Sequence, residues 1–336
     1  MAGRPVAVLR PRQVLSFSYN AAPRAVLNRN EMKRDTELVA TPFGSFHAFR
    51  GDMVTRQLKT FGAHQRNELA MVMSVVEPGD HVIDIGGHIG TFSIPIARRV
   101  TDAGRVFTFE PVDEHIQLLE RNIKENDVMG SVRVFRSIVT DVPGRYAIHT
   151  SHRNTSLSTF RLQTADQDGD IPCMNLDEWW RQQRDSGKLA ARVRLIKIDV
   201  EGMELNVLRS GRRVLESDRP ILYFEVALAH MNASGNRLDE MNDLMKQFGY
   251  DFFLNLGQRN SATDAFELGR FSSLSKGGRF FDVLAIHPDD AHYPTRFLDC
   301  RQTERRLARR RLKEAVNLRR IRKSITSRLR LSRRRD

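Results

Sequence analysis

The fold of this chain is decided by nine consecutive residues, Val-Ile-Asp-Ile-Gly-Gly-His-Ile-Gly, at positions 82–90. They predict a short buried strand, a glycine turn and a helix that begins near Thr91. Open α/β folds bind nucleotide-like ligands at such a turn, at the edge of a parallel sheet. A dinucleotide fingerprint requires G-x-G-x-x-G, but aligning its last two glycines with Gly87 and Gly90 places Ile85 on the first. The pattern is instead acid-x-Gly-x-x-x-Gly, with the acid at Asp84.

A second carboxylate completes the prediction of a ligand. Residues 105–110 form another apolar run that ends at Glu110, 20 residues after Gly90. An acid at the end of the second strand can accept hydrogen bonds from both hydroxyls of a ribose, which NAD and S-adenosylmethionine both present. The glycine register distinguishes the two, because it suits a ligand with a cationic amino-acid end and no pyrophosphate. The sequence therefore predicts S-adenosyl-L-methionine as the cofactor.

The predicted cofactor-binding residues share a place at the carboxyl ends of the first three strands: Asp84, Gly86, Gly87, His88, Gly90, Glu110 and Ser137. The turn is expected to bind the amino-acid end, and Glu110 the ribose. Ser137 ends the third strand, near the usual position of the adenine ring, although a serine there can also be a plain strand-end residue. His88 is a candidate to orient the cofactor or act as a base, with a purely structural turn histidine as the alternative.

Composition indicates a globular chain of one large or two small domains, with 336 residues of which 40% are hydrophobic. No apolar run approaches the ~18 residues needed to span a bilayer. Residues 1–17 lack the continuous apolar segment of a signal peptide. Cys173 and Cys300 form neither a disulfide framework nor a metal-ligand pattern. We therefore expect a cytoplasmic protein, with peripheral attachment to the inner membrane face left open.

The net charge of +13 belongs to the C-terminal end of the chain. Residues 301–336 contain sixteen Lys and Arg against three acids, so this segment accounts for the whole excess and the remainder is neutral. Apolar residues recur in it at steps of three to five, which predicts a basic helix over about 303–331. Basic amphipathic helices bind anionic membranes, arginine clusters bind phosphate backbones, and such tails can also be solvated and without a partner.

Strands and helices alternate after the glycine turn, the pattern of a mostly parallel sheet covered on both faces. The predicted domains are a flexible N-terminal arm (1–40), a catalytic domain (41–299) and a basic C-terminal helical tail (300–336). Further predictions are a strand over 41–49, a helical segment over 52–76, a third strand over 131–139, irregular chain with a short hairpin over 143–175, a helix over 201–210, and a polar loop over 257–278.

The chain resembles the FkbM family of S-adenosylmethionine-dependent methyltransferases over roughly residues 44–286. The most specific match is Leu-Ile-Lys-Ile-Asp-Val-Glu-Gly-Met-Glu at 195–204, supported by Gly51-Asp52, Pro78-Gly79-Asp80, the turn at 84–90 and Phe109-Glu110-Pro111. Two positions depart from the family, since Gly87 and His88 stand where its members usually have Ala and Asn. The resemblance implies a Rossmann-like class I methyltransferase with a mostly parallel seven-stranded sheet and helices on both faces. It also implies methyl transfer to a hydroxyl, often of a sugar or natural product.

Two carboxylates at the end of the fourth strand are the predicted catalytic residues. Asp199 is placed to act as the general base or to orient the substrate hydroxyl, with Glu201 beside it at the start of a helix. The structural alternative is that both only favour the helix N-terminus. Lys197, in the same strand, needs a partner if it is buried, and an ion pair with a sheet carboxylate such as Glu225 is favoured over a catalytic role. A divalent-cation site at Asp199, Glu201 and Glu225 is a minor alternative, and no metal is predicted.

The predicted function is thus O-methylation of a sugar, glycan or natural-product acceptor. Trp179 and Trp180 are candidates for a sugar-binding platform, although a short helix more often buries such a pair. An RNA methyltransferase that uses the basic tail is the main alternative, but the neutral body lacks a basic stripe. A non-catalytic binding module on the same fold is the third. The substrate, the oligomeric state and the role of the tail do not follow from the sequence.

Overall fold

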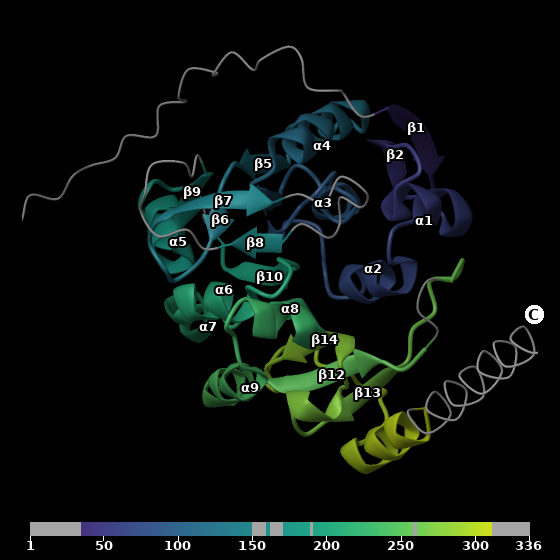
Figure 1. Ribbon diagram of the computed structural model, residues 1–336, viewed down its shortest axis with the longest axis vertical. Helices are drawn as coiled ribbons and strands as arrows, with labels where there is room; N and C mark the ends of the chain where they lie inside the picture. The colour runs from purple at the N-terminus through teal and green to yellow at the C-terminus, as the bar shows by residue number, and fades with distance from the viewer. Residues whose placement is uncertain (1–34, 150–158, 162–170, 189–190, 258–260, 311–336) are drawn as a thin grey trace, which may run out of the picture. The chain divides into compact units, whose positions relative to one another are not determined.

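The computed structural model describes residues 35–149, 159–161, 171–188, 191–257 and 261–310 (Figure 1). An eight-stranded sheet with the order β13-β12-β14-β11-β10-β3-β4-β5 forms its centre. The strands are β3 (His81–Ile85), β4 (Arg105–Phe109), β5 (Val132–Phe135), β10 (Val193–Ile198), β11 (Ile221–Ala227), β12 (Asp251–Asn255), β13 (Leu268–Phe271) and β14 (Phe280–Ile286). The five neighbouring strands β5, β4, β3, β10 and β11 are parallel. The last two strands expected from the sequence are β12 and β14, which pair antiparallel with each other, and β14 also pairs antiparallel with β11.

The predicted fold class is confirmed, but the sheet has eight strands where seven were predicted. The additional strand, β13, pairs antiparallel with β12 and lies inside the segment predicted as a polar loop. Its four residues, Leu-Gly-Arg-Phe, include a glycine and are too few for a clear alternation of apolar and polar residues.

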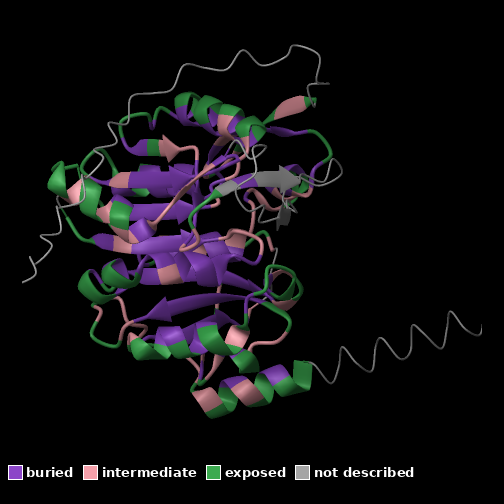
Figure 2. Cartoon of the chain, turned by 60° about the vertical axis from the view of Figure 1, so that its left-hand side comes forward, coloured by how far each residue is buried: buried purple, intermediate pink, exposed green. Residues whose placement is uncertain are grey.

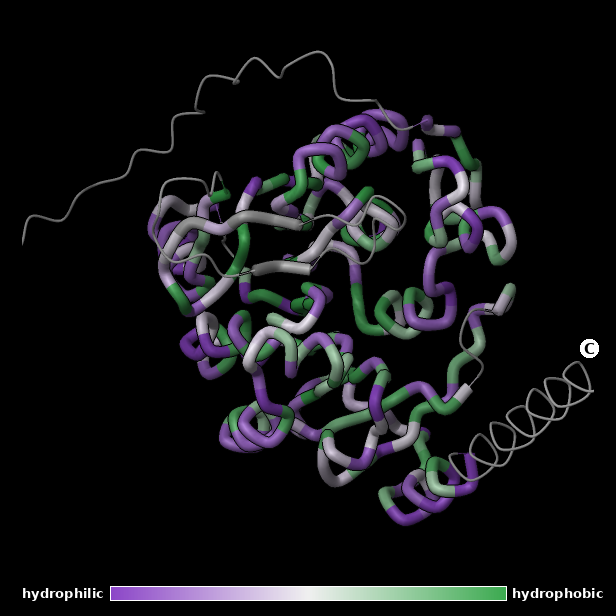
Figure 3. Tube along the Cα trace, viewed as in Figure 1, coloured by the Kyte–Doolittle hydropathy of each residue, from purple (hydrophilic) through white to green (hydrophobic). Residues whose placement is uncertain are grey.

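Side-chain alternation along the strands separates two hydrophobic cores, one on each face of the sheet. Ile83 and Ile85 belong to one core, whereas Val82 belongs to the other. The strands are accordingly buried and the exposed residues lie on the outer surfaces of the helices (Figure 2). Hydrophobic and hydrophilic residues therefore alternate around helices such as α4 and α9 (Figure 3).

The helices α1 to α9 cover the two faces, and a further helix over 300–310 adds Leu307 to the first core. The first core receives side chains from α5 (Leu176–Asp185), α6 (Glu204–Ser210), α7 (Arg212–Ser217), α8 (Leu228–Ala233) and α9 (Leu238–Gln247). The second receives them from α1 (Met53–Phe61), α2 (Arg66–Met73), α3 (Ser93–Val100) and α4 (Asp113–Glu125). The helical pattern predicted over 52–76 is interrupted, because Gly62 ends α1 in the left-handed conformation.

The N-terminal part of the described chain is a hairpin of β1 (Thr36–Thr41) and β2 (Gly44–Phe49). The predicted strand over 41–49 is therefore two strands, and the ordered domain begins before residue 41. Residues 1–34 of the predicted arm lie outside the described residues. Two asparagines hold the hairpin. Asn122 of α4 bonds the N–H and C=O groups of His47, and Asn126, the C-cap of α4, bonds those of Ser45.

The third predicted strand is divided in two. β5 stays in the main sheet, whereas β6 (Ile138–Val139) pairs with β9 (Ile171–Met174) in a small sheet of order β6-β9-β7-β8. β7 (Arg145–His149) and β8 (Thr159–Arg161) form the predicted hairpin. Residues 150–158 and 162–170 of this region lie outside the described residues.

The predicted basic tail begins as a helix over 300–310. Thr303 and Leu307 are buried against the domain, and Arg306 pairs with Glu267 at 2.6 Å. The first three turns of the tail therefore belong to the folded domain, and the domain does not end at residue 299. Residues 311–336 lie outside the described residues. None of the described helices combines the length and hydrophobicity that crossing a membrane requires.

Replacing Asn122 with Ala is expected to lower the free energy of unfolding by about 2–4 kcal/mol, since it leaves buried backbone groups without partners. Asn122 is fully buried and also donates to the carbonyl of Ile89, next to the glycine turn. Chemical denaturation of both proteins measures the difference. Gln117→Ala, an exposed position on the same helix, is the control and should change stability by less than about 0.5 kcal/mol.

Candidate functional site

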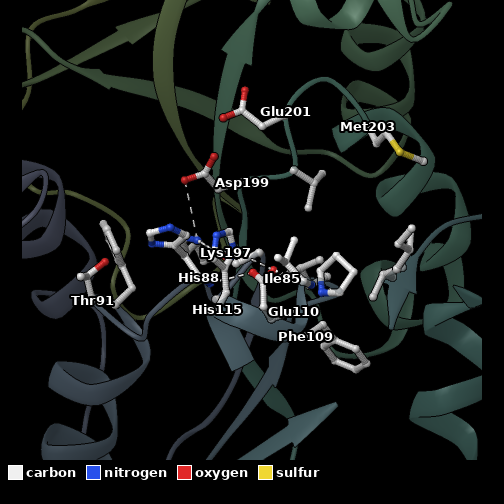
Figure 4. A pocket seen from close by; sticks show the side chains of 18 of the residues that line it. Ile85, His88, Thr91, Phe109, Glu110, His115, Lys197, Asp199, Glu201 and Met203 are labelled. Carbon is white, nitrogen blue, oxygen red and sulfur yellow. Dashed lines mark hydrogen bonds and ion pairs between the residues drawn. The ribbon is translucent and has the colours of Figure 1, made fainter. Parts of the chain in front are cut away.

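A cavity of about 860 Å³, including its open mouth, lies at the carboxyl edge of the parallel strands. The carboxyl edge is the place of ligand sites in open α/β sheets. The turn after β3, the ends of β4 and β10, and the start of the small sheet all contribute to its wall (Figure 4). Of the predicted site residues, the cavity is lined by Gly86, Gly87, His88, Glu110, Ser137, Asp199 and Glu201.

The glycine turn depends on backbone conformations that few residues adopt. Gly86 has φ +85° and Gly90 has φ +91°. A Cβ atom on Gly86 would lie 1.9 Å from the backbone oxygen of Asp199, so only glycine fits between β3 and β10 here. The turn thus brings bare backbone to the cavity wall, as close approach to a ligand requires.

His88 also lies in the left-handed region, at φ +49°. Asparagine tolerates this region best among non-glycine residues, which accounts for the residue usually found at this position in the family. The backbone N–H of His88 donates to Oε2 of Glu110 at 2.8 Å, and its ring packs edge-on against His115 at 4.2 Å. The histidine therefore links the turn to the end of β4.

Glu110 is held in place by three hydrogen bonds. Oε2 accepts from His88, while Oε1 accepts from the N–H of Val112 and from Nδ1 of His115 at 3.1 Å. A carboxylate offers about four acceptor positions, so one remains. A carboxylate oxygen accepts, so we assign the donated proton to Nδ1 of His115, which leaves Nε2 as a second acceptor; this buried atom has no partner among the described residues.

A buried ion pair supports the turn from below. Nζ of Lys197 lies 3.0 Å from Oδ1 of Asp84 and donates to the carbonyl of Gly86 at 2.9 Å. Burial lowers the pKa of Lys197, but the carboxylates of Asp84 and Asp199 outweigh it, so the pKa is raised and the ammonium is kept. The predicted partner, Glu225, was wrong: the register of β10 with β3 places Asp84 directly opposite Lys197.

Asp84 is the buried partner of Lys197 beneath the glycine turn, and it does not line the cavity. It is fully buried, and its Oδ2 accepts a 2.5 Å hydrogen bond from Ser93, which also contacts Thr108 at 2.9 Å. Asp84 therefore reaches the turn through Lys197, and any contribution it makes to ligand binding is indirect. Asp199 is the second carboxylate near Lys197, with its Oδ2 3.8 Å from Nζ of the lysine.

Glu201 does not begin a helix, because α6 starts at Glu204. Its backbone is left-handed, with φ +53°, which costs about 1–3 kcal/mol for a non-glycine residue and is found mostly at functional sites. Burial, with the nearby charges of Asp199 and Glu204, raises the pKa of Glu201 to about 9. Oε2 lies 2.6 Å from Nδ1 of His230 on α8. The acid that favours the helix N-terminus is Glu204, which accepts from the N–H groups of Val200 and Gly202.

Ser137 lies where the main and small sheets separate. It is buried, and its hydroxyl bonds the carbonyls of Ile138 and Pro172 at 3.0 and 3.1 Å. Its contact with an adenine ring stays a prediction. Trp179, by contrast, packs against Phe107, Phe109 and Phe135 in the core, so it is no sugar platform.

No three His, Cys, Asp or Glu side chains of the described residues are arranged to hold a metal ion. Apolar side chains such as Phe109, Val139 and Met203 form the rest of its wall.

The pattern of the methyltransferase FkbM domain matches residues 84–252. This range is half of the chain and runs from Asp84 below the turn to β12. The chain belongs to the FkbM family of methyltransferases. Membership confirms the prediction of S-adenosylmethionine as the methyl donor.

Two curated proteins are similar to this FkbM methyltransferase. Methyltransferase sdnD of Sordaria araneosa is 24% identical over 195 residues, which cover 51% of this chain and 73% of that protein. Methyltransferase 1 of Beauveria bassiana is 24% identical over 148 residues, which cover 38% and 57%.

Among solved structures, the FkbM methyltransferase of Methylobacillus flagellatus is similar at 16% identity and a TM-score of 0.38, over 64% of this chain and 48% of that one. A methyltransferase of Aquifex aeolicus has 12% identity and a TM-score of 0.36, over 70% and 93%.

The residues present fit the cofactor. The free acceptor position on Glu110 and the unpartnered Nε2 of His115 supply two acceptors for the two ribose hydroxyls. The left-handed turn supplies the space that a side chain on Gly86 would fill. The apolar residues at the ends of β4 and β6 suit an adenine ring.

Two histidines were missed from the sequence. His115 lies one turn into α4, five residues after Glu110, at a position that reads as part of the helix's apolar face. His230 lies three residues after the end of β11. The only signal for these histidines in the sequence is that each follows the carboxyl end of a strand by a few residues.

Lys197→Met is expected to lower the free energy of unfolding by about 3–5 kcal/mol, because it leaves the buried Asp84 without its counter-charge. Adding Asp84→Asn to this variant should restore part of the loss. Lys188→Met, at an exposed position, is the control. Denaturation curves of the four proteins test this, and equal losses in the single and double variants would show that the pair is not coupled.

Proposed function

We propose that the protein is an S-adenosylmethionine-dependent O-methyltransferase that acts on a hydroxyl of a sugar, glycan or natural-product acceptor. The observation that carries this proposal is the single cavity that joins the glycine turn and Glu110 to Asp199 and Glu201. One side of the cavity offers the groups that a nucleoside and an amino acid need, and the other offers carboxylates for a hydroxyl. When bound, the cofactor supplies a methyl group on a sulfonium for transfer to the acceptor oxygen.

Asp199 is assigned the role of orienting the acceptor. It is a quarter exposed to the cavity, its backbone N–H is fixed by the carbonyl of Ile85, and its carboxylate lies beside the ammonium of Lys197. A carboxylate that is held in this way is a fixed hydrogen-bond acceptor for a hydroxyl group, and fixed geometry is a large part of catalysis. Lys197, buried beneath it, is a positioning residue.

A hydroxyl acceptor is favoured over a nucleic acid by the walls of the cavity. Beyond Asp199, the wall continues with Val200, Glu201 and Met203, and the one lysine beside Asp199 is buried and paired with Asp84. A phosphate backbone would meet two carboxylates there, and none of the described residues that line the cavity is an arginine. A non-catalytic binding module on the same fold is disfavoured by the left-handed backbone of Glu201. A glycine would adopt this conformation with less strain, so the glutamate side chain is better explained by a role in the reaction.

Glu110→Gln is expected to weaken binding of S-adenosylmethionine about 10- to 100-fold, through the loss of charged hydrogen bonds to the ribose. The amide nitrogen would also face an N–H donor, that of His88 or that of Val112, because the two donors bond different oxygens of Glu110. Isothermal titration measures the affinity, with Glu120→Gln, an exposed residue of α4, as the matched control. An unchanged affinity would remove Glu110 from the ribose site, and no binding by folded wild-type protein would oppose the proposed function.

We further propose that residues 301–336 hold the protein at an anionic membrane surface, where lipid-linked glycans lie. Support comes from the docked start of the tail, where Arg301, Arg305 and Arg309 are exposed while Leu307 is buried. The eleven basic residues after Arg310 follow directly. Each Lys or Arg near an anionic surface contributes about 1 kcal/mol.

Full-length protein is expected to co-sediment with vesicles of phosphatidylglycerol and phosphatidylcholine, and protein ending at Arg310 to lose most of this binding. The truncation keeps Thr303 and Leu307, so the body stays intact. Pure phosphatidylcholine vesicles and 0.5 M salt are the controls, and both should abolish binding. Failure to sediment, together with a tail-dependent shift of RNA in a gel, would replace the membrane by nucleic acid.

A further inference from the structure

The loop between α1 and α2 contributes to the cavity from outside the range that matches the family. His64, in this loop, lines the cavity together with Val54 of α1. The matched range begins at Asp84, so both positions precede it. Membership of the family therefore assigns no role to His64.

Two hydrogen bonds close the loop around His64. The N–H of Gln65 donates to Oε1 of Gln57 on α1 at 3.0 Å, and Nη1 of Arg66 donates to the carbonyl of Phe61 at 2.8 Å. Gln65 has a left-handed backbone, with φ +47°, which is a strained conformation for a residue other than glycine. The loop thus keeps His64 at a fixed place in the cavity wall.

His64 lies beside the residue that follows the glycine turn. Its Nδ1 is 3.4 Å from Oγ1 of Thr91, which comes directly after Gly90 and also lines the cavity. Thr91 is 5% exposed, so its hydroxyl has little access to bulk solvent. A distance of 3.4 Å is long for a hydrogen bond, so a ligand oxygen that binds both groups can replace this contact.

These two side chains lie at the end of the cavity where the amino-acid part of the cofactor is expected. Thr91 and Phe109 lie on opposite sides of Glu110 (Figure 4), and the apolar side at Phe109 suits the adenine ring. On the other side, the ring of Phe92 stacks on that of Tyr223 of β11, with 5.9 Å between the ring centres. A ligand with its ribose at Glu110 and its adenine at Phe109 therefore extends its amino-acid end toward Thr91.

The amino-acid end carries a carboxylate, which requires hydrogen-bond donors when it leaves water. Apart from the acids, the side chains with an N–H or O–H donor in the described wall of the cavity are His64, His88, Thr91, His115, Ser137 and Lys197. Ser137 donates to two backbone carbonyls, and Nδ1 of His115 is assigned to Glu110. The ammonium of Lys197 is paired with Asp84. Three of these donors thus serve the protein itself.

The other three donors are His64, Thr91 and His88. The ring of His88 packs edge-on against His115, on the ribose side. His64 and Thr91 instead contact each other, so together they offer a ring N–H and a hydroxyl to the two oxygens of one carboxylate. Asp199, at the end of β10, is a negative charge in the same cavity and repels a second carboxylate, which favours the loop as its place.

We infer that His64 and Thr91 bind the carboxylate of the cofactor's amino-acid end, and that they thereby select ligands with this end over other adenosine thioethers. The inference rests on the proposed function, which places S-adenosylmethionine in the cavity. Contacts at both ends of the ligand fix the sulfur between them, whereas a ligand held only by its ribose and adenine can turn about its bonds to sulfur.

The test compares two ligands that share adenosine and a neutral sulfur. S-adenosylhomocysteine carries the amino-acid end, whereas 5′-methylthioadenosine has a methyl group in its place. Isothermal titration of the full-length protein with each ligand gives two affinities, and their ratio measures recognition of the amino-acid end alone. Damage to the fold or to the ribose site weakens both ligands and leaves the ratio unchanged.

His64→Ala is expected to weaken binding of S-adenosylhomocysteine about 10- to 100-fold, through the loss of a hydrogen bond to a charged group, and that of 5′-methylthioadenosine less than about twofold. His64→Gln, which keeps an N–H donor, should lose less affinity than His64→Ala. Thr91→Val should also weaken only S-adenosylhomocysteine. His287→Ala, a histidine that follows β14 at the opposite edge of the sheet, is the matched control and should bind both ligands as wild type does.

Unchanged binding of S-adenosylhomocysteine by His64→Ala would overturn the inference, as would an equal loss for both ligands in His64→Ala and Thr91→Val. A loss confined to His88→Asn would assign the carboxylate to His88 and overturn it as well. The same holds if wild-type protein binds the two ligands equally tightly. Failure of folded wild-type protein to bind either ligand would instead contradict the proposed function, so the two failures are distinguishable.

Discussion

The ion pair of Lys197 and Asp84 is the interaction on which the site depends. Both side chains are almost completely removed from solvent, and separating them would leave a charge in the interior. Their pairing joins β10 to β3 at the level where both strands end. The carbonyl of Gly86 and the carboxylate of Asp199 are then placed by the same ammonium group, so one lysine positions both the glycine turn and the strand end at Asp199.

Around this pair, each wall of the cavity is fixed by groups that cannot move independently. Glu110 bonds the turn and the start of α4, and the loop at Glu201 is bonded to α6 and α8. The two hydrophobic cores lie on opposite faces of the sheet. The geometry of the cavity wall therefore depends on the sheet register and on the hydrogen bonds of these loops.

Sequence patterns predicted the parts of this arrangement that are local. The turn, the strand end at Glu110 and the bounds of α4 follow from motif and periodicity, because neighbouring residues determine them. The partner of Lys197 depends on how β10 is aligned with β3, more than a hundred residues earlier in the chain, and no local pattern specifies that register. The same reason applies to His230, whose partner Glu201 comes from another element. The strands β13 and β6 were not predicted as separate strands, because four and two residues are too few to show a periodic pattern of apolar side chains.

The contact of Gly86 with Asp199 has a consequence for how such a protein can diversify. The two backbones meet with no room for a methyl group, so the glycine turn and the strand end at Asp199 share a single wall. Under the proposed function, new acceptor preferences must then arise from segments that border the cavity without forming this wall. The small sheet is such a segment, since its strands bond to one another and leave the ladder of the main sheet intact. The proposed function thus directs variation in the acceptor toward the small sheet, while the backbone contact fixes the positions around 86 and 199.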